Sequence, residues 1–231
     1  MSKLELLKRY LFFTLGLFIN ALGVSLITKA QLGTSPISSA PFTLSLGFPL
    51  TMGTFTFLLN MVLIVGQIAF LRKEFSKIQL LQIPVSVVFG YFIDFTMSML
   101  SSLDPQEYIF KLLYLLLGCM ILGLGVSMEV VADVVMLSGE AFVKALSGKF
   151  EKEFGITKIF FDGTLTLIAI ILSLVLFQKV VGVREGTIVA AFAVGLFARG
   201  FNKGFRLLSS LPISSLPIFR FSVNCNESLD E

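Results

Sequence analysis

The chain has 231 residues, of which 55% are hydrophobic and only 14% are charged, and its mean hydropathy is +0.91. About a quarter of the residues in soluble domains are charged, so this composition indicates an integral membrane protein and excludes an ordinary soluble domain. The absence of histidine removes the commonest metal ligand and the commonest general base at neutral pH.

Six apolar stretches are long enough to cross a bilayer core of about 30 Å, which requires about 20 helical residues. In chain order they cover residues 10–28, 51–71, 78–100, 108–128, 155–177 and 187–205. The fold class that follows is all-α and transmembrane, with six spans.

Two further segments, 29–50 and 129–154, are too polar for a span and too apolar for ordinary loops. In the first, Gly33 permits a sharp turn, Ser35 is a favoured N-cap and Pro36 a favoured first helical residue, which predicts a half-helix near 35–46. In the second, Ser138 is expected to cap a half-helix near 138–147. Both segments are predicted to re-enter the membrane; full crossing and amphipathic helices at the interface are the alternatives.

Residues 15–25 are similar to residues 117–127, and Leu-Gly (15–16) and Leu-Gly-Val-Ser (22–25) recur there at a constant offset of 102. We therefore divide the chain into an N-terminal repeat (1–102), a C-terminal repeat (103–207) and a disordered cytoplasmic tail (208–231). With three spans in each repeat the second copy is inverted, as in many transporters. The repeated glycines, seven residues apart on one helix face, are expected to allow close helix packing.

The distribution of basic residues predicts the orientation. With both termini in the cytoplasm, four of the 18 lysines and arginines lie outside, namely Lys29, Lys111, Lys179 and Arg184, which leaves 18 − 4 = 14 inside. Full crossing of the two odd segments would instead place the basic 72–77 loop outside, against this rule.

The starts of the two half-helices are the predicted binding site. Helix N-termini carry unsatisfied N–H groups and a partial positive charge, so two of them near the midplane would attract an anionic or zwitterionic group. The expected ligand-binding hydroxyls and amides are those of Thr34, Ser35, Ser38, Ser138 and Gly139.

Placing an ionisable side chain in an apolar membrane segment costs free energy, so each such residue is a candidate for a functional role. Glu129 and Asp133 would share a helix face if the helix continues, and one of them is expected to carry proton or cation coupling; both could instead mark a helix end. Glu140 falls in the first turn of the second half-helix, where the helix dipole favours a carboxylate.

Asp162 aligns with Asn60 at the offset of 102, which suggests a shared central cavity, although hydrogen bonding between helices explains the pair nearly as well. Arg184 and Glu185 are either a short-loop ion pair or, if they reach the cavity, a clamp for a carboxylate. We include all four residues among the candidate ligand-binding positions.

The sequence resembles the YczE/YitT-type family of bacterial integral membrane proteins. The resemblance rests on four segments: Ala-Leu-Gly-Val-Ser (21–25), Leu-Gly-Thr-Ser-Pro (32–36), Met-Leu-Ser-Gly-Glu (136–140) and Val-Gly-Val-Arg-Glu-Gly-Thr (181–187). The chain departs from the family at Ser138, where proline is usual, and at Ile37-Ser38, where an aromatic-acid pair is usual. The resemblance implies a multi-pass protein of the bacterial plasma membrane and names no substrate.

The function predicted from these features is secondary transport of a small polar or zwitterionic solute, such as an amino acid or organic acid. The alternative is a membrane accessory or regulatory protein with no transport cycle. We expect no enzyme activity, cofactor, metal or nucleic-acid partner; the expected partners are the solute and the bilayer, and a homodimer is left open.

Overall fold

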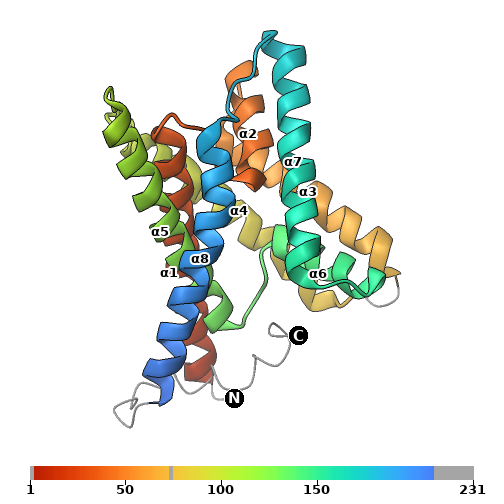
Figure 1. Cartoon of the computed structure of the whole chain (residues 1–231). Coiled ribbons are helices and arrows are strands. Elements are labelled where there is room, and N and C mark those ends of the chain that lie inside the picture. Colours follow the sequence, from red (N-terminus) through yellow and green to blue (C-terminus); the bar gives the residue numbers. More distant parts are fainter. Residues whose placement is uncertain (1–2, 73–74, 211–231) are drawn as a thin grey trace.

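The computed structural model describes residues 3–72 and 75–210, and these residues form an all-helical fold (Figure 1). The α-helices are α1 (Lys3–Lys29), α2 (Pro36–Gly47), α3 (Met52–Leu71), α4 (Gln82–Met99), α5 (Tyr108–Ala132), α6 (Ser138–Phe150), α7 (Phe154–Phe177) and α8 (Glu185–Ser210). A 3-10 helix, η2 (Lys77–Leu81), leads into α4.

Six of these helices are long and apolar enough to cross a membrane, which confirms the six predicted spans. The two others, α2 and α6, have 12 and 13 residues and are too short to cross. The predicted tail boundary at residue 208 is wrong, because α8 continues to Ser210; the rest of the tail lies outside the described residues.

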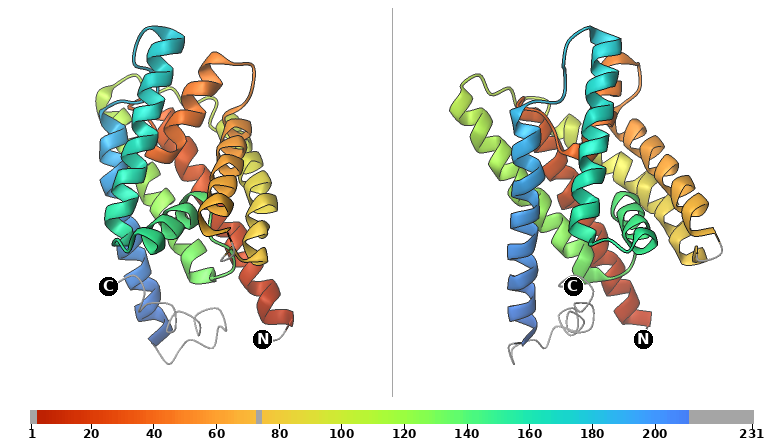
Figure 2. Two further views of the ribbon diagram at one scale, coloured as in Figure 1. Left: turned by 90° about the vertical axis from the view of Figure 1, so that its right-hand side faces the viewer. Right: turned by 45° about the vertical axis from the view of Figure 1, so that its right-hand side comes forward.

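The two short helices occupy opposite halves of the molecule. We call the end where α1 begins and α8 finishes the terminal end, and the opposite end the far end. Figures 1 and 2 show α2 in the far half and α6 in the terminal half, with the long helices running between the two ends. Each short helix lies between two long helices in the chain, α1 and α3 for α2, and α5 and α7 for α6.

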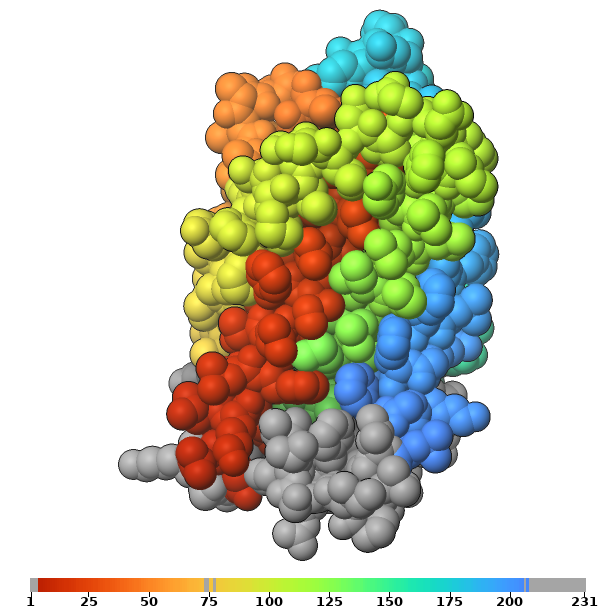
Figure 3. Space-filling view, turned by 90° about the vertical axis from the view of Figure 1, so that its left-hand side faces the viewer, coloured from red at the N-terminus to blue at the C-terminus, as the bar shows by residue number. Residues whose placement is uncertain are grey.

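The antiparallel helices α1 and α5 pack closely because glycine lets their backbones meet, as the repeated glycines predict. A Cβ added to Gly23 would lie 2.5 Å from the backbone nitrogen of Leu122, and one added to Gly125 would lie 2.5 Å from that of Asn20. Likewise, a Cβ on Gly118 would lie 2.7 Å from the Ile27 side chain. Figure 3 shows this face, with α1 beside α5 and α5 beside α8.

The helices form two bundles, each with its own core. The long-helix bundle consists of α1, α4, α5 and α8, and the half-helix bundle of α2, α3, α6 and α7. Most of the first core comes from α1, α4 and α5, with Leu17, Ile27, Ile93, Leu115 and Leu122 among its members. The second is smaller and is formed by Leu63, Val143, Phe161 and Leu165. The bundles meet mainly along α3 and α4.

Large apolar side chains cover the outside of the long helices. Phe160 on α7 is 73% exposed, and Val175 on α7 and Leu196 on α8 are each 69% exposed. Such a surface is unfavourable in water and suits the hydrocarbon of a bilayer.

Candidate functional site

The first half-helix begins at a buried pair of serines. Ser35 occupies the predicted N-cap position and Pro36 the first helical position, but the Ser35 side chain accepts no backbone hydrogen bond. Its Oγ instead donates to Oγ of Ser38 over 2.9 Å, and both side chains are buried. The N–H groups at the start of α2 therefore have no side-chain cap.

A tight turn brings the chain to this point. Gly33 has a φ of +115°, which favours glycine, and a Cβ there would lie 2.5 Å from Oγ1 of Thr187. The amide of Thr34 donates to the same Thr187 hydroxyl over 3.3 Å, and the amide of Gly186 donates to the carbonyl of Leu32 over 2.8 Å. These contacts, which we call the far seam, join the start of α2 to the start of α8.

The second half-helix begins at Ser138, one residue earlier than it would if Ser138 were its N-cap. Ser138 is the first helical residue of α6 and Leu137 is the N-cap, so the predicted capping role is wrong. The Ser138 hydroxyl lies 3.2 Å from the Ser86 hydroxyl, and its carbonyl accepts from Nε2 of Gln67 over 3.1 Å. The Ser138 hydroxyl therefore lies beside a hydroxyl of α4 and does not cap α6.

The starts of the two half-helices contact each other. A Cβ added to Gly139 would overlap Cδ1 of Ile37, the second residue of α2. Ile37 also packs against the core of the half-helix bundle. The two N-termini, with their partial positive charges, therefore face a common region that the Ile37 side chain partly fills.

Two polar groups on the helices that hold both half-helices lack partners. Asn60 on α3 is 5% exposed and its Nδ2 has no hydrogen-bond acceptor among the described residues. On α7, Oδ2 of Asp162 lies 3.6 Å from Nζ of Lys158, while its Oδ1 is buried without a donor in the same described part of the chain. Since α3 and α7 each pack on α2 and α6, both groups lie in the half-helix bundle, and Asp162 acts electrostatically on Glu140 in the first turn of α6.

Glu129 is the buried carboxylate on the opposite bundle. Oε1 accepts from Nδ2 of Asn20 over 2.8 Å, and Oε2 is buried with no donor among the described side chains. Glu140 on α6 acts on Glu129 electrostatically. Burial raises the pKa of the Glu140 carboxyl above its ordinary value of 4.5; the Lys158 ammonium lowers it, and the Asp162 carboxylate raises it further.

Three further candidates are exposed. Helix α5 ends at Ala132 and Asp133 is exposed in a left-handed conformation, so it does not share a helix face with Glu129 as predicted. Arg184 and Glu185 are exposed near the far end, where Nη1 of Arg184 donates to the carbonyl of Gln31 over 3.1 Å. The Arg184 side chain therefore binds the loop before α2, and its amide lies at the far seam, 3.0 Å from where a Cβ on Gly33 would be.

Sequence reasoning did not identify a buried amide pair beside Ser138. Gln67 on α3 and Gln82 on α4 are 0% and 2% exposed and exchange two hydrogen bonds of 3.1 and 3.2 Å. With Ser86 and Ser138 they join the two bundles toward the terminal end, and we call these contacts the terminal seam. Glutamine inside an apolar helix is the signal that could have indicated them.

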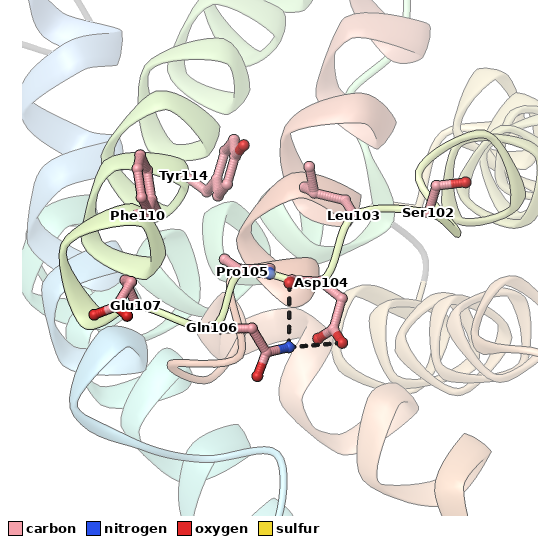
Figure 4. A pocket seen from close by; sticks show the side chains of 8 residues that line it. All are labelled: Ser102, Leu103, Asp104, Pro105, Gln106, Glu107, Phe110 and Tyr114. Carbon is pink, nitrogen blue, oxygen red and sulfur yellow. Dashed lines mark hydrogen bonds between the residues drawn. The ribbon is translucent and has the colours of Figure 1, made fainter.

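A surface pocket of about 440 Å³ lies elsewhere, on the loop between α4 and α5 at the far end (Figure 4). Its lining is largely loop, and Nε2 of Gln106 there donates to Oδ2 of Asp104 over 2.9 Å. Asp104 also accepts from Gln31, whose Oε1 accepts from Lys111 over 3.0 Å. These exposed polar residues tie loops together and do not reach the half-helix starts.

The chain is similar to two proteins of Bacillus subtilis (strain 168). It is 35% identical over 131 residues to "Uncharacterized membrane protein YczE", covering 56% of this chain and 59% of that protein. It is 28% identical over 118 residues to "Uncharacterized protein YyaS", covering 51% of this chain and 57% of that protein. The matches thus span less than two thirds of these relatives. No solved structure matches the chain.

The profile of one family matches residues 7–203, from the first span to near the end of the last. This agrees with the resemblance found in the half-helix segments and with the similarity to YczE. The protein is therefore a multi-pass integral membrane protein that belongs to DUF6198, a family of unknown function of the YczE type.

Proposed function

We propose that this protein is a secondary transporter whose solute binds between the starts of α2 and α6. The observation that carries the proposal is the contact of the two starts at Ile37 and Gly139, in a bundle whose helices α3 and α7 also bury polar atoms that lack partners among the described residues. Polar groups buried in this way destabilise a membrane protein unless something binds them, so they are typical of functional positions.

The chemistry of this region favours a zwitterionic solute of amino-acid size. Uncapped helix N-termini attract a carboxylate, because their N–H groups and dipoles both favour negative charge. Glu140 and Asp162 would attract an ammonium group, while Lys158 offsets part of their charge. The hydroxyls of Thr34, Ser35, Ser38 and Ser138 and the amide of Asn60 would complete the polar lining.

The proposal includes an inverted repeat. Its support is the reciprocity of contacts between the halves: Gly23 packs on Leu122, and at the offset of 102 their counterparts Gly125 and Asn20 also pack on each other. In the same way α2 packs on α7, and α6 on α3. Such reciprocity is expected of two copies related by a two-fold axis.

We further propose that the terminal end is cytoplasmic and the membrane is the bacterial plasma membrane. The support is the charge rule, since the four basic residues assigned to the outside adjoin the far-end loops. The far seam and the terminal seam would then open in turn, each giving the solute access from one side. Both are closed in the structure.

Uptake into proteoliposomes tests the function. The probe is a panel of labelled neutral amino acids and small carboxylic acids, offered under proton and sodium gradients. We expect accumulation of at least one, and a loss of about tenfold or more in Gly139→Val, whose side chain would meet Ile37, corresponding to about 1.4 kcal/mol. Gly148→Val on the same helix is the matched control, because no atom lies within 4 Å of a Cβ there.

If no solute of the panel moves, or if both glycine variants behave alike, the proposed site is wrong. A protein without transport that co-purifies with a stoichiometric membrane partner would instead support the accessory role.

The terminal seam can be tested separately by cross-linking. Ser86→Cys combined with Ser138→Cys places two thiols where hydroxyls lie 3.2 Å apart, which suits disulfide formation. With a protease site inserted in the exposed 101–107 loop, an oxidised protein stays in one piece after cleavage. We expect this disulfide to stop uptake and a reductant to restore it. Ser86→Cys with Ser147→Cys is the control pair and should not cross-link.

A further inference from the structure

Glu129 is held in an arrangement that leaves half of its carboxylate unused. The residue is 5% exposed, Asn20 fixes Oε1 over 2.8 Å, and Oε2 is buried with no donor among the described residues. An ionised carboxylate with a free oxygen is strongly unfavourable in such surroundings. A proton or a cation on Oε2 would remove this cost.

The packing of α1 on α5 does not itself require this polar pair. The same two helices also meet where Gly23 packs on Leu122 and Gly118 packs on Ile27, and there the side chains in contact are apolar. Ile27 and Leu122 are buried and belong to the main core. Because α1 and α5 pack closely at Gly23 and Gly118 without a polar side-chain pair, Asn20 and Glu129 serve a purpose other than packing.

A proton is the cation that fits. A metal ion needs several ligands, and no group of three or more carboxylates or thiols within residues 3–72 and 75–210 is arranged to hold one. Among the described residues, the groups that act on Glu129 are Asn20 from α1 and Glu140 from α6. Lys158 and Asp162 on α7 act in turn on Glu140.

Glu129 belongs to the long-helix bundle and Glu140 to the half-helix bundle. Glu140 acts electrostatically on Glu129 from the half-helix bundle; two negative charges repel, and the repulsion falls when one of them binds a proton. Proton binding forms an O–H bond at Oε2 with a proton from water, and its release returns the proton to water.

We propose that Glu129, positioned by Asn20, is the proton-binding residue that sets the separation of the two bundles. A proton on Glu129 favours closed bundles, and its loss favours open ones, which would couple a proton gradient to the opening of the seams. The role of Glu129 in coupling rests on the proposed function. The proton-controlled change in the spacing of the bundles does not, and it can be tested without a solute.

The test is a distance measurement by pulsed electron spin resonance in liposomes at several pH values. Spin labels are attached at Lys144→Cys on α6 and Lys203→Cys on α8, both exposed, with Cys225 replaced by serine and the buried Cys119 retained. We expect the distance to lengthen as the pH rises. In Glu129→Gln, which keeps an acceptor for Asn20, we expect the short distance at every pH.

Two further variants keep the test decisive. Glu140→Gln removes the opposing charge and is expected to lose most of the pH-dependent lengthening, even if Glu129→Gln fails to fold. Asp133→Asn changes an exposed carboxylate four residues from Glu129 and is expected to behave like the unmodified protein. A distance that never changes with pH, or one that still lengthens in Glu129→Gln, overturns the inference.

The outcomes separate this inference from the proposed function. If no solute binds but the distances change as described, the transporter proposal fails and the proton switch remains. If a solute is transported but Glu129→Gln still concentrates it under a proton gradient, the switch fails and the transporter remains.

Discussion

The two bundles face each other along two pairs of helices, α3–α4 and α7–α8, which differ in how closely they pack. Along α3 and α4 the backbones touch, since a Cβ added to Gly53 would overlap the carbonyl oxygen of Gly90. Asp94 strengthens this edge, because its two oxygens accept from the amide of Gly53 over 2.8 Å and from Oγ1 of Thr51 over 2.7 Å. Along α7 and α8 the described residues make no comparable packing (Figure 1).

This difference shows which edge can move. The α3–α4 edge is fixed by backbone contact and by the carboxylate of Asp94 on α4, which binds the start of α3. This edge therefore suits a hinge. The α7–α8 edge has few contacts to break. We therefore expect the bundles to separate at α7–α8 while they stay joined at α3–α4.

The largest expected effect comes from breaking the hinge. Gly53→Leu forces a side chain into the Gly90 backbone, which cannot move aside as a flexible side chain would. Overpacking of this kind costs about 3 kcal/mol, so we expect a large drop in Tm and in the yield of monodisperse protein. A variant with unchanged Tm would show that the close approach is not needed.

A smaller effect is expected from loosening the same edge. Asp94→Ala leaves the amide of Gly53 and the hydroxyl of Thr51 without their acceptor, at a cost of about 2 kcal/mol in the free energy of unfolding. Glu107→Ala is the matched control, because Glu107 occupies the N-cap of α5 without a capping bond. Equal Tm values for the two variants would argue against the anchoring role of Asp94.

A pH-dependent effect is expected at the interface between the bundles. Because burial raises the pKa of Glu140, the folded protein holds this proton more strongly than the unfolded chain does. Its contribution to stability is therefore greatest below the ordinary value of 4.5 and is lost as the pH rises through the raised pKa. Glu140→Gln should gain Tm relative to the unmodified protein as the pH increases, whereas the exposed Glu153→Gln should not. A constant difference would contradict this.

The smallest effect is expected at two exposed glycines of the long helices. Gly195→Leu on α8 and Gly163→Leu on α7 add side chains where nothing lies within 4 Å. We expect each to change the free energy of unfolding by less than about 1 kcal/mol, as measured by Tm. A severe loss in either variant would show that this position packs against another surface.

Local signals in the sequence predicted the spans and the half-helices well. Spans follow from the length of apolar runs, and α2 follows from Pro36 at its first turn and Gly47 at its end. The same local reasoning failed at Ser138, because α6 already begins there with Leu137 as its N-cap, and the Ser138 hydroxyl lies against Ser86.

Charged and amide side chains were harder to place. The spacing of Asp133 from Glu129 predicts a shared helix face, yet a left-handed residue ends α5. Arg184 is predicted either to pair in a loop or to reach a cavity, and a loop carbonyl binds its guanidinium. The Gln67–Gln82 pair depends on two helices folding against each other, which the sequence does not display. The position of Glu129 opposite Asn20 likewise requires the crossing of α1 and α5.

The glycine-lined packing of α1 on α5 joins the first half of the chain to the second without help from the peptide that links them. The linking loop, residues 101–107, is mostly exposed and lies outside both cores. Two polypeptides made separately, one ending and the other beginning in this loop, should therefore find each other in the bilayer and reconstitute the whole. Such a protein could be assembled from two genes as readily as from one.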